Sequence, residues 1–457
     1  MFRTIALLFF VIATIARAAE YEVGPGKACR AIADVPWNAL APGDRVSIFW
    51  RAEPYREKWV ICREGTREQP IVVRGIANAK GELPVIDGNG AVTAKGLDYW
   101  GEQRSVIKIG GASNPKDTMP AFISIENLDV RGARPPFAFT GRKGLAKYAA
   151  EASAIWIEKG AHVTVRGCVL HDCANGFFVS SGSREVLMEH CLIFDNGMER
   201  SIYQHNIYTE ANGITFQYNR LGPLRAACFG NNLKDRSAGL VVRYNWIEGG
   251  NRELDLVDSD HADIRAEPAY RRAFVYGNVI IEPPEDGNNQ IVHYGGDSGK
   301  AAFYRNGTLY FFNNTVVSRR NDNTVLFRLA TNDEHVDCRN NILFVTAPGR
   351  NLAMLDAAGQ LGMFNNWMKP GWVQSHGKLT GRVTANGSIE GDNPGFTNAA
   401  QNDFHLTPTS PSRKAAAPLP PEALPEHNLA REYPDQPRVD EKATRCDLGA
   451  FSFRENR

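Results

Sequence analysis

Several features that mark large protein classes are missing from this chain of 457 residues. Lys and Arg number 52 against 51 Asp and Glu, so no excess charge of one sign attracts a nucleic acid or a membrane surface. The eight cysteines form no CxxC pair, which argues against a zinc site. Beyond residue 18 no apolar run approaches the length of a membrane span. We therefore expect no nucleic-acid partner and no integral membrane segment in the remaining chain.

The first 18 residues read MFRTIALLFFVIATIARA. A short cationic start, an apolar stretch and the sequence Ala16-Arg17-Ala18 are typical of a secretory signal peptide. We therefore expect a periplasmic or secreted mature chain. An even number of cysteines permits disulfides in such an oxidising compartment, and we favour a pair between Cys29 and Cys62.

The chain does contain a repeated pattern, in which an apolar stretch leads into Asn or Cys and then into apolar residues again. From Cys168 to Asn366 the copies follow one another at intervals of 23 to 36 residues. Periods of this length indicate a solenoid, in which each repeat buries its apolar face against its neighbours. The shared position holds Asn127, Cys168, Cys191, Asn219, Asn245, Asn278, Asn314, Asn341 and Asn366.

The repeats alternate apolar and polar residues, are rich in Val, Ile, Phe and Tyr, and are broken by Gly, Asn and Asp. This composition predicts coils built of strands. One Asn per coil suits an internal ladder of side chains at a tight bend, because Asn tolerates left-handed backbone and bonds its neighbours. Cys168 and Cys191 can fill the same place as small apolar residues. We therefore predict an all-β, single-domain parallel β-helix over residues 19–410.

Both ends of the predicted solenoid need a cover. Residues 29–40 could form a short amphipathic helix that caps the open first coil. Residues 411–457 begin with a stretch rich in Pro and charge. We expect them to run over the surface as an extended tail that a closing strand ties back.

Counting back from the apolar segments aligns residues of successive coils, about 4.8 Å apart. The aligned columns hold Ile157, Ser180, Tyr208 and Lys234, and Lys159, Gly182, Glu210 and Arg236. If Leu233 points inward, Lys234 points outward, so Tyr208, Glu210, Lys234 and Arg236 should form an outward cluster that Asp255 extends.

This cluster suits an acidic polysaccharide that is cleaved by β-elimination at a uronate. Arg236 could clamp the substrate carboxylate as a planar two-point donor. Lys234 could be the general base, because the nearby fixed cation favours its neutral amine. Tyr208 or His205 could be the acid, although His205 shares the parity of Ile207 and could instead be structural.

Three long segments are candidates for the walls of a binding face, because insertions gather on one face of a solenoid. They are 131–153, 251–272 and 282–306. The first is basic, and we expect substrate binding by Arg131, Arg134, Arg142 and Lys143, together with Glu210, His293 and Tyr294. In the second, alternating carboxylates could bind calcium. These carboxylates are Asp255, Asp258, Asp260 and Asp263, and the alternative is an acidic surface loop.

The sequence also resembles a known group of secreted proteins. Its start carries GPG, APGD, PIVVRG and VIDG, and its end carries DNPGFTNAAQNDFHLTPTSPS and CDLGAF. With the repeats between them, these stretches are similar to right-handed β-helix proteins of polysaccharide lyase family six, the chondroitinase B-like and alginate-lyase-like enzymes. The resemblance implies a right-handed parallel β-helix and an acidic polysaccharide substrate. Relatives of this group often use calcium to neutralise the uronate.

The stretch NNLKDRSAGLVVRYNWIEGGNRELDLVDS resembles the catalytic region of that family. Lys234 matches the position of the family's catalytic Lys base. Val257 stands where the family has its catalytic Arg and Asp258 where it has His, so the resemblance supplies neither of these two catalytic residues. Residues 258–261 are also a poor match to the D-P-H-D motif of alginate C5-epimerases.

Three alternatives to a lyase stay open. A uronate C5-epimerase shares the proton abstraction but returns the proton. A glycoside hydrolase could use Asp255 and Asp258 as its paired carboxylates, although polygalacturonase signatures are missing. A non-catalytic glycan-binding β-helix could use Trp156, Trp246 and Trp367 to stack on sugars. We expect a monomer in each case.

Overall fold

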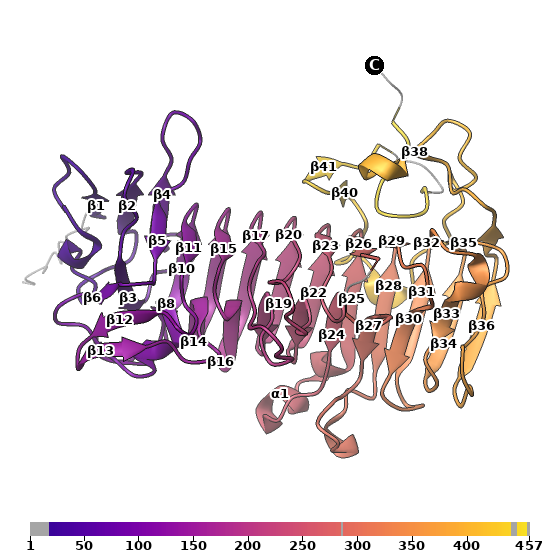
Figure 1. Cartoon of the computed structure of the whole chain (residues 1–457), viewed down its shortest axis with the longest axis horizontal. Coiled ribbons are helices and arrows are strands. Elements are labelled where there is room, and N and C mark those ends of the chain that lie inside the picture. Colours follow the sequence, from indigo (N-terminus) through magenta and orange to yellow (C-terminus); the bar gives the residue numbers. More distant parts are fainter. Residues whose placement is uncertain (1–17, 285–286, 440–445, 455–457) are drawn as a thin grey trace, which may run out of the picture.

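The chain folds into an elongated parallel β-helix, whose coils stack along one axis in the computed structural model (Figure 1). The structure describes residues 18–284, 287–439 and 446–454. The predicted signal peptide therefore lies outside the described residues, apart from its last position. Among the described residues, no helix is long and apolar enough to cross a membrane.

Three rows of parallel strands form the sides of the β-helix, and every strand pairs with its counterpart one coil away. The first row contains β3 (Glu57–Ile61), β8 (Ser105–Ile109), the start of β14 (Ser153–Arg166), the start of β16 (Asn175–Glu189), β18 (Ile207–Thr209), β21 (Leu233–Asp235), β24 (Leu254–Leu256), β27 (Gln290–Tyr294), β30 (Thr324–Leu329) and β33 (Leu352–Leu355).

The second row begins the chain and takes the later halves of β14 and β16. Its other strands are β1 (Glu20–Val23), β2 (Arg45–Phe49), β4 (Ile71–Ile76), β10 (Ala121–Glu126), β19 (Asn212–Gln217), β22 (Ala238–Arg243), β25 (Arg272–Tyr276), β28 (Thr308–Phe312), β31 (His335–Arg339), β34 (Gln360–Phe364) and β36 (Arg382–Asn386).

The third row is a separate sheet of short strands. It contains β5 (Val85–Asp87), β11 (Asp129–Arg131), β15 (Val169–His171), β17 (Leu192–Ile193), β20 (Arg220–Leu221), β23 (Trp246–Glu248), β26 (Val279–Glu282), β29 (Thr315–Ser318), β32 (Ile342–Val345), β35 (Trp367–Met368) and β37 (Ile389–Glu390).

The remaining elements are short and lie outside the rows. They are β6 (Val92–Thr93), β7 (Asp98–Tyr99), β9 (Ala112–Asn114), β12 (Ala138–Gly141), β13 (Gly144–Lys147), β38 (Phe396–Asn398), β39 (Asp403–Leu406), β40 (Arg431–Glu432), β41 (Gln436–Pro437), the helix α1 (Ala262–Ala266) and the 3-10 turns η1 (Ile32–Asp34), η2 (Glu102–Arg104), η3 (Pro268–Arg271), η4 (Ala301–Phe303), η5 (Gly349–Asn351), η6 (Ala399–Gln401) and η7 (Pro421–Ala423).

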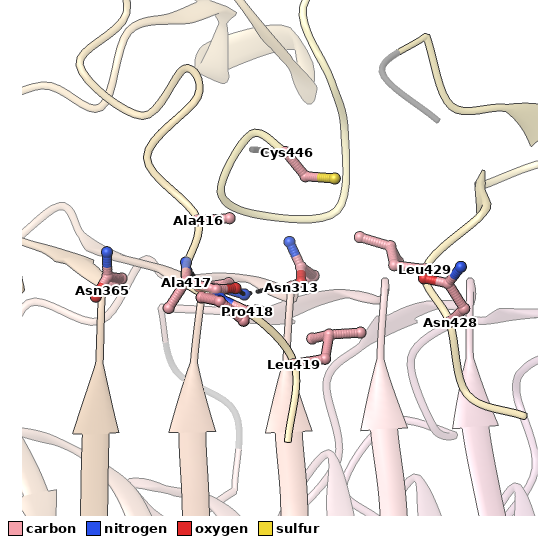
Figure 2. Close-up of a pocket in the computed structure, with 10 residues that line it drawn as sticks. Asn313, Asn365, Ala416, Ala417, Pro418, Leu419, Asn428, Leu429 and Cys446 are labelled. Carbon is pink, nitrogen blue, oxygen red and sulfur yellow. Dashed lines mark hydrogen bonds between the residues drawn. The ribbon is translucent and has the colours of Figure 1, made fainter. Parts of the chain in front are cut away.

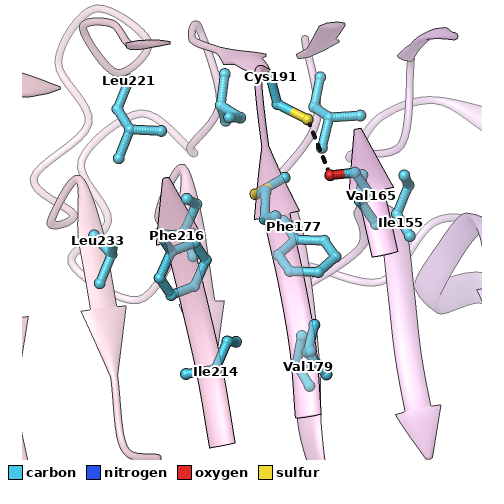
Figure 3. Packing of buried hydrophobic residues seen from close by; sticks show 14 of the residues in the cluster. Ile155, Val165, Phe177, Val179, Cys191, Ile214, Phe216, Leu221 and Leu233 are labelled. Atoms are coloured by element: carbon cyan, nitrogen blue, oxygen red, sulfur yellow. Dashed lines mark hydrogen bonds between the residues drawn. The ribbon is translucent and has the colours of Figure 1, made fainter. Parts of the chain in front are cut away.

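The core is a continuous column of apolar side chains inside the coils (Figure 3). Ile155 pairs with Phe177, which pairs with Ile207, and the last pairs with Leu233. All four are fully buried. Each coil thus covers the apolar face of the one before it, as the repeat pattern predicted.

The predicted asparagine ladder is confirmed from Asn219 to Asn366. Asn219 Nδ2 donates to Asn245 Oδ1 at 3.0 Å, and the same bond recurs to the end of the series. The left-handed residue is the one before each ladder asparagine, for example Tyr244 with φ 56°. Asn127 occupies this preceding position with φ 53°, so its inclusion in the ladder was wrong.

The predicted N-terminal capping helix is reduced to the 3-10 turn η1. Pro36 follows and has no N–H to continue a helix. The side chain of Asp34 accepts the backbone N–H groups of Arg30 and Ala31 and so holds the turn. The segment still covers the first coils, because Trp37 is buried and stacks on Trp59 with ring centroids 5.4 Å apart.

Cys29 and Cys62 are both free thiols, so the predicted disulfide between them is wrong. The backbone N–H of Cys29 donates to Glu22 on the first coil. The buried Cys62 follows β3, with its sulfur 3.9 Å from an Asp117 carboxylate oxygen. Cys168 and Cys191 fill ladder positions inside the core as expected.

The C-terminal tail lies against the edge of the β-helix and leaves a cavity beneath it (Figure 2). Asparagines at left-handed positions hold it. Asn340 Oδ1 accepts the N–H of Ala417 at 2.7 Å, and its Nδ2 donates to the Ala417 carbonyl at 2.9 Å. Asn365 Nδ2 donates to the carbonyl of Ala415. The expected closing strand is not formed, since residues 446–454 are irregular, although Phe451 is buried.

Candidate active site

Five strands of the first row lie side by side and present one outward residue each. The parallel register joins β18, β21, β24, β27 and β30 in that order. The residues before and after each outward position face the core, such as Leu233 and Leu254. The outward column is Tyr208, Lys234, Asp255, His293 and Arg328.

A second asparagine ladder fixes the entry to these strands, and sequence reasoning missed it. Asn196 Nδ2 donates to Asn206 Oδ1 at 3.0 Å, and Asn206 Nδ2 donates to Asn232 Oδ1 at 3.0 Å. Asn206 and Asn232 immediately precede Ile207 and Leu233, the first residues of β18 and β21. The ladder therefore sets the height at which Tyr208 and Lys234 leave the backbone.

Lys234 lies between two carboxylates. Its Nζ donates to Asp255 Oδ2 and, at 2.6 Å, to Asp297 Oδ2. Asp297 Oδ1 also accepts from Arg236 Nη2 at 3.0 Å. Burial raises the pKa of both carboxyls, but the charge and hydrogen bond of Lys234, together with His293 at Asp255 and Arg236 at Asp297, outweigh burial and lower both pKa values. Nζ of Lys234 is thus a hydrogen-bond donor to two carboxylates, and this geometry does not fit its predicted role as a proton acceptor.

His293 is held in one orientation by Asp255. Its Nδ1 lies 2.8 Å from Asp255 Oδ1, and an ionised carboxylate can only accept, so the proton is on Nδ1. The other nitrogen, Nε2, is buried and has no hydrogen-bond partner among the described residues. His293 lines the same cleft as Lys234. With the proton on Nδ1, Nε2 carries a lone pair in an oriented ring, just beneath the surface of the cleft.

His205 has the opposite tautomer. Its Nδ1 accepts the backbone N–H of Asn231 at 2.9 Å, so the proton is on Nε2. Burial and the neighbouring Lys234 lower the pKa of His205 to about 3, which keeps the ring neutral. Because Nδ1 is already an acceptor and Nε2 carries the proton, the neutral ring can donate a hydrogen bond but is a poor proton-transfer group. Its ring meets Tyr208 edge-on, with centroids 5.5 Å apart.

These residues line a cleft of about 470 Å³. Arg236 Nε donates to the Tyr208 hydroxyl at 3.1 Å and ties the two side chains together. The walls come from 251–252 and 296–304, so two of the three long segments meet at the cleft as predicted. Three apolar side chains stand exposed at its rim, Ile202, Tyr203 and Phe229.

A buried carboxylate shapes one wall. Asp258 Oδ1 accepts the N–H of Asp297 at 2.7 Å and that of Ser298 at 3.3 Å, and the Ser298 hydroxyl donates to Oδ2. This anchor folds the 296–299 turn over Lys234 and Arg236. Asp258 therefore positions Asp297 and is not itself exposed to the cleft.

The predicted calcium site is not formed. Among the described residues no three His, Cys, Asp or Glu side chains gather as a metal site. Asp255 faces the cleft and Asp258 is used by the 296–299 turn. Asp260 is exposed and pairs with Lys300 at 3.3 Å, and Asp263 lies in the first turn of α1. After Asp255 the backbone leaves the strand and turns away. The alternating carboxylates that follow therefore point in different directions.

Other predicted site residues lie elsewhere. Tyr294 faces the core and is fully buried, one position beyond the outward column, so its substrate-binding role was wrong. Glu210 does not line the cleft, because its carboxylate accepts from the Ser259 hydroxyl. Burial raises the pKa of Glu210 and Ser259 partly offsets this.

The four basic residues of 131–153 lie near the N-terminal coils and not in the cleft. Arg131, on β11 of the third row, lies 3.6 Å from Asp87. Arg134 pairs with Asp172 at 2.8 Å. Arg142 and Lys143 follow β12 and line a separate hollow. None of the four can contact a ligand that is confined to the cleft.

The predicted column needs one correction. Tyr208 continues into Phe178 and Trp156, and not into Ser180 and Ile157. A register shift between Ile157 and Lys159 breaks a simple count along β14. Sequence reasoning also missed Arg328, which is exposed, lines the cleft and has no ion pair or hydrogen bond within the described chain. Its parity in TVLFRL, opposite that of Phe327, was the available signal.

Comparisons with known proteins agree with this architecture. Residues 85–266 match the family model described as right handed beta helix region. Curated proteins gave no match to the sequence. Two solved structures align over most of this chain, pectate lyase Pel9A (TM-score 0.50, 11% identity, 96% of this chain and 98% of that one) and the GH136 lacto-N-biosidase from Eubacterium ramulus (0.51, 12%, 81% and 67%).

An alginate lyase from Paenibacillus sp. str. FPU-7 also matches, with a TM-score of 0.44 and 13% identity over 70% of this chain and 91% of that one. At these identities the likeness concerns the fold, and the chain is a right-handed parallel β-helix. The finer resemblance to polysaccharide lyase family six stays a prediction.

Proposed function

We propose that this protein is a carbohydrate-active β-helix enzyme that cleaves an acidic, uronate-containing polysaccharide by β-elimination. One observation supports the proposal most. His293, the guanidinium of Arg328 and the amino group of Lys234 line one cleft within four consecutive coils. Elimination needs these three functions: a base for the C5 proton, a cation for the carboxylate, and a proton for the leaving oxygen.

His293 is the proposed base. Asp255 holds its Nδ1–H, so Nε2 keeps the lone pair that removes the C5 proton. Arg328 is the next residue of the column, about 4.8 Å along the axis. A uronate carboxylate bound to Arg328 would place its own C5 beside His293, because the carboxyl carbon is bonded to C5. The guanidinium stabilises the charge that develops on that carboxylate.

Lys234 is the proposed proton donor. Its Nζ and the His293 ring bind the two oxygens of the same Asp255 carboxylate, so donor and base flank one anion. The C5–H electrons form the C4–C5 double bond, the bond from C4 to the bridging oxygen breaks, and Lys234 supplies a proton to that oxygen. Tyr208 and the His205 Nε2–H, at the other end of the cleft, would bind sugar hydroxyls.

A glycoside hydrolase is less well supported. Asp255 and Asp297 approach each other through Lys234, as paired carboxylates of such an enzyme would. That reaction needs one protonated carboxyl near neutral pH, whereas both of these pKa values are lowered. A C5-epimerase would use the same base and differ in its product. The predicted secreted or periplasmic location and the monomeric state belong to this proposal.

The test follows ultraviolet absorbance of the new double bond while the purified protein is incubated with a panel of acidic polysaccharides. We expect a rise on one of them. His293→Asn keeps a donor toward Asp255 but removes Nε2, and kcat should fall about 100- to 10,000-fold. His376→Asn, at an exposed histidine outside the cleft, should leave kcat unchanged.

Two results would contradict the proposal. The first is full activity of His293→Asn, which would show that His293 is not the base. The second is a flat trace on every acidic polymer. Altered uronate stereochemistry without absorbance would then indicate an epimerase, new reducing ends a hydrolase, and binding without turnover a glycan-binding protein.

A further inference from the structure

A second hollow of about 410 Å³ lies near the N-terminal end of the β-helix. It is formed between β7, the turn η2 and the hairpin of β12 and β13. The residues that matter are Trp100, Arg142 and Lys143. Nothing in the proposed reaction uses this hollow.

Trp100 presents a large aromatic ring to solvent, with 48% of the residue exposed. The indole lies close to Gly111, where an added Cβ would meet its Nε1 at 2.5 Å. The Trp100 carbonyl accepts from the buried Lys108 Nζ, which holds the backbone beneath the ring. A fixed, exposed ring with a polar N–H suits the apolar face of a sugar.

Two accessible cations lie beside this ring, together with the carboxylates of Asp98 and Glu102. Lys143 is exposed and has no ion pair among the residues that the structure describes. Arg142 pairs with Asp98 at 3.1 Å, but its side chain is 54% exposed and that of Asp98 34%. An ion pair this open contributes little and can exchange for a ligand carboxylate. Glu102 accepts from the Thr93 hydroxyl and from the backbone N–H of Arg142, so its carboxylate already has partners. The hollow thus combines an aromatic face with two cations that a ligand can reach.

The hollow is aligned with the cleft. Lys108 pairs with Trp156, Trp156 with Phe178, Phe178 with Tyr208, and Tyr208 with Lys234. Four strand spacings separate the ends of this series, about 19 Å. Two stacked aromatic rings fill the gap, the buried Trp156 and the half-buried Phe178, with centroids 3.9 Å apart. The Arg104 guanidinium lies 5.0 Å from the Trp156 ring.

We propose that the hollow at Trp100, Arg142 and Lys143 is a remote binding site for the same acidic polysaccharide chain that enters the cleft. The polysaccharide runs along the outer face of the first row. It is bound at both ends of this path, which is about 19 Å, or four strand spacings, long. The inference rests on the proposed function for the charge of the substrate. It predicts that long chains bind more tightly than fragments too short to reach Trp100.

The test measures binding and turnover separately. Retardation in native gels that contain alginate, polygalacturonate or hyaluronan measures polymer binding, with dextran as the uncharged control. The binding experiments use the His293→Asn background so that the polymer stays intact. The double variant Trp100→Ala/Lys143→Gln should weaken polymer binding about 10-fold. Turnover of a trisaccharide by the same double variant with His293 intact should not change.

Two control variants separate binding from folding. Trp100→Tyr keeps an aromatic face and should bind nearly as well as the unchanged chain. Lys378→Gln removes an exposed lysine near the other end of the β-helix and matches the charge change of Lys143→Gln. Its polymer binding should stay within about twofold, because that lysine lies far from the path.

Three results would overturn the inference: equal polymer binding by the double variant, an equal loss with the trisaccharide, or no retardation of the unchanged chain in any acidic gel. The proposed function fails differently. If no unsaturated product forms but the double variant still loses polymer binding, the remote site stands and the lyase does not.

Discussion

At the scale of single residues, Asp297 pairs with two of the cations that line the cleft. Its carboxylate is shared by Lys234 Nζ at 2.6 Å and Arg236 Nη2 at 3.0 Å. It stands on the 296–299 turn, whose Gly296 and Gly299 also line the cleft. A second uronate of the polymer, beside the one bound to Arg328, would compete with this carboxylate for Lys234 and Arg236.

We predict that Asp297→Asn tightens the binding of acidic polymer, because two cations lose their internal partner. The dissociation constant should fall several-fold at low ionic strength and the effect should shrink as salt is added. Asp333→Asn changes the net charge equally at an exposed site and is the control. Unchanged or weaker binding in Asp297→Asn would show that Asp297 positions Lys234 without competing for it.

His205 makes the fold sensitive to acid. Its pKa is lowered to about 3, first by burial and then by Lys234, so the unfolded chain takes up a proton that the folded chain refuses. Stability from this group is complete above the ordinary value of about 6.5 and is lost as the pH falls below it. His205→Asn keeps an acceptor for the Asn231 N–H and removes the titration.

Between about pH 7 and pH 5 the unchanged chain should lose about 2 kcal/mol more free energy of unfolding than His205→Asn. Urea unfolding at the two pH values measures this difference. The exposed His376 provides the control substitution, His376→Asn, which should not alter the loss. Equal losses in all three proteins would mean that His205 is protonated in the folded state.

Parity along a strand predicted the outward direction of Lys234 and Asp255, because side chains alternate faces at each residue. The roles could not be predicted in the same way. They depend on which carboxylates reach Lys234, and Asp297 arrives from a loop that is remote in sequence. The free Nε2 of His293 likewise depends on a bond to Asp255, 38 positions away.

At the scale of elements, the site strands are braced from inside the β-helix by an ion pair. Asp235 and Arg305 are both fully buried, with Arg305 Nη2 3.4 Å from Asp235 Oδ1. Arg305 also donates to the backbone carbonyls of Val257 and Ser237. Asp235 is the residue between Lys234 and Arg236, so this brace holds the centre of the site.

We predict that Arg305→Met lowers the free energy of unfolding by about 3–5 kcal/mol, because it leaves a buried carboxylate without its cation. Adding Asp235→Asn should recover part of the loss, since the amide needs no counter-charge. Thermal and urea unfolding of the single and double variants measure both values. A double variant no more stable than Arg305→Met alone would contradict a charge-based cause.

The repeat pattern predicted the strand rows, since alternation and turn residues mark each strand locally. It could not predict the register shift in β14 that moved Ile157 out of the Tyr208 column. Nor could it predict that 29–40 forms only a 3-10 turn, because the apolar spacing of that segment fits a helix. Its buried side chains cover the first coils through packing of irregular backbone.

At the scale of the whole molecule, the tail and the cleft lie apart. In Figure 1 the tail strands β40 and β41 and the helix α1 project from opposite edges of the stack. Tail docking depends on Asn340, which makes two hydrogen bonds to Ala417. Asn340 has a left-handed backbone, with φ 60°. Two coils earlier, the equivalent residue before a ladder asparagine is Gly277, with φ 66°.

We therefore predict that Asn340→Gly loosens the tail without disturbing the turn. Proteolysis within the tail should become several-fold faster, since the docked backbone loses two hydrogen bonds of about 1 kcal/mol each. The melting temperature and turnover at the cleft should change little. A large drop in melting temperature would instead show that the tail stabilises the coils it covers.

The order of coils and the meeting of two long loops at one cleft were predicted from the sequence, because neighbours in a solenoid are neighbours along the chain. The third long segment, 131–153, was predicted to lie at the same cleft only because it is a long insertion like the other two. It lies at the N-terminal end instead, where Arg142 and Lys143 form part of the remote hollow. Distance along the axis depends on the number of intervening coils, and only the register reveals that number.

The asparagine ladder gives the molecule an unusual mechanical character. Pulled from its two ends, the stack would open one coil at a time, because each coil contacts only its neighbours. Releasing the 25 residues between Asn341 and Asn366 frees about 85 Å of extended chain. The 36 residues between Asn278 and Asn314 free about 120 Å. Under tension the protein should therefore extend in unequal steps, and within the asparagine ladder the longest step is the one beside the cleft.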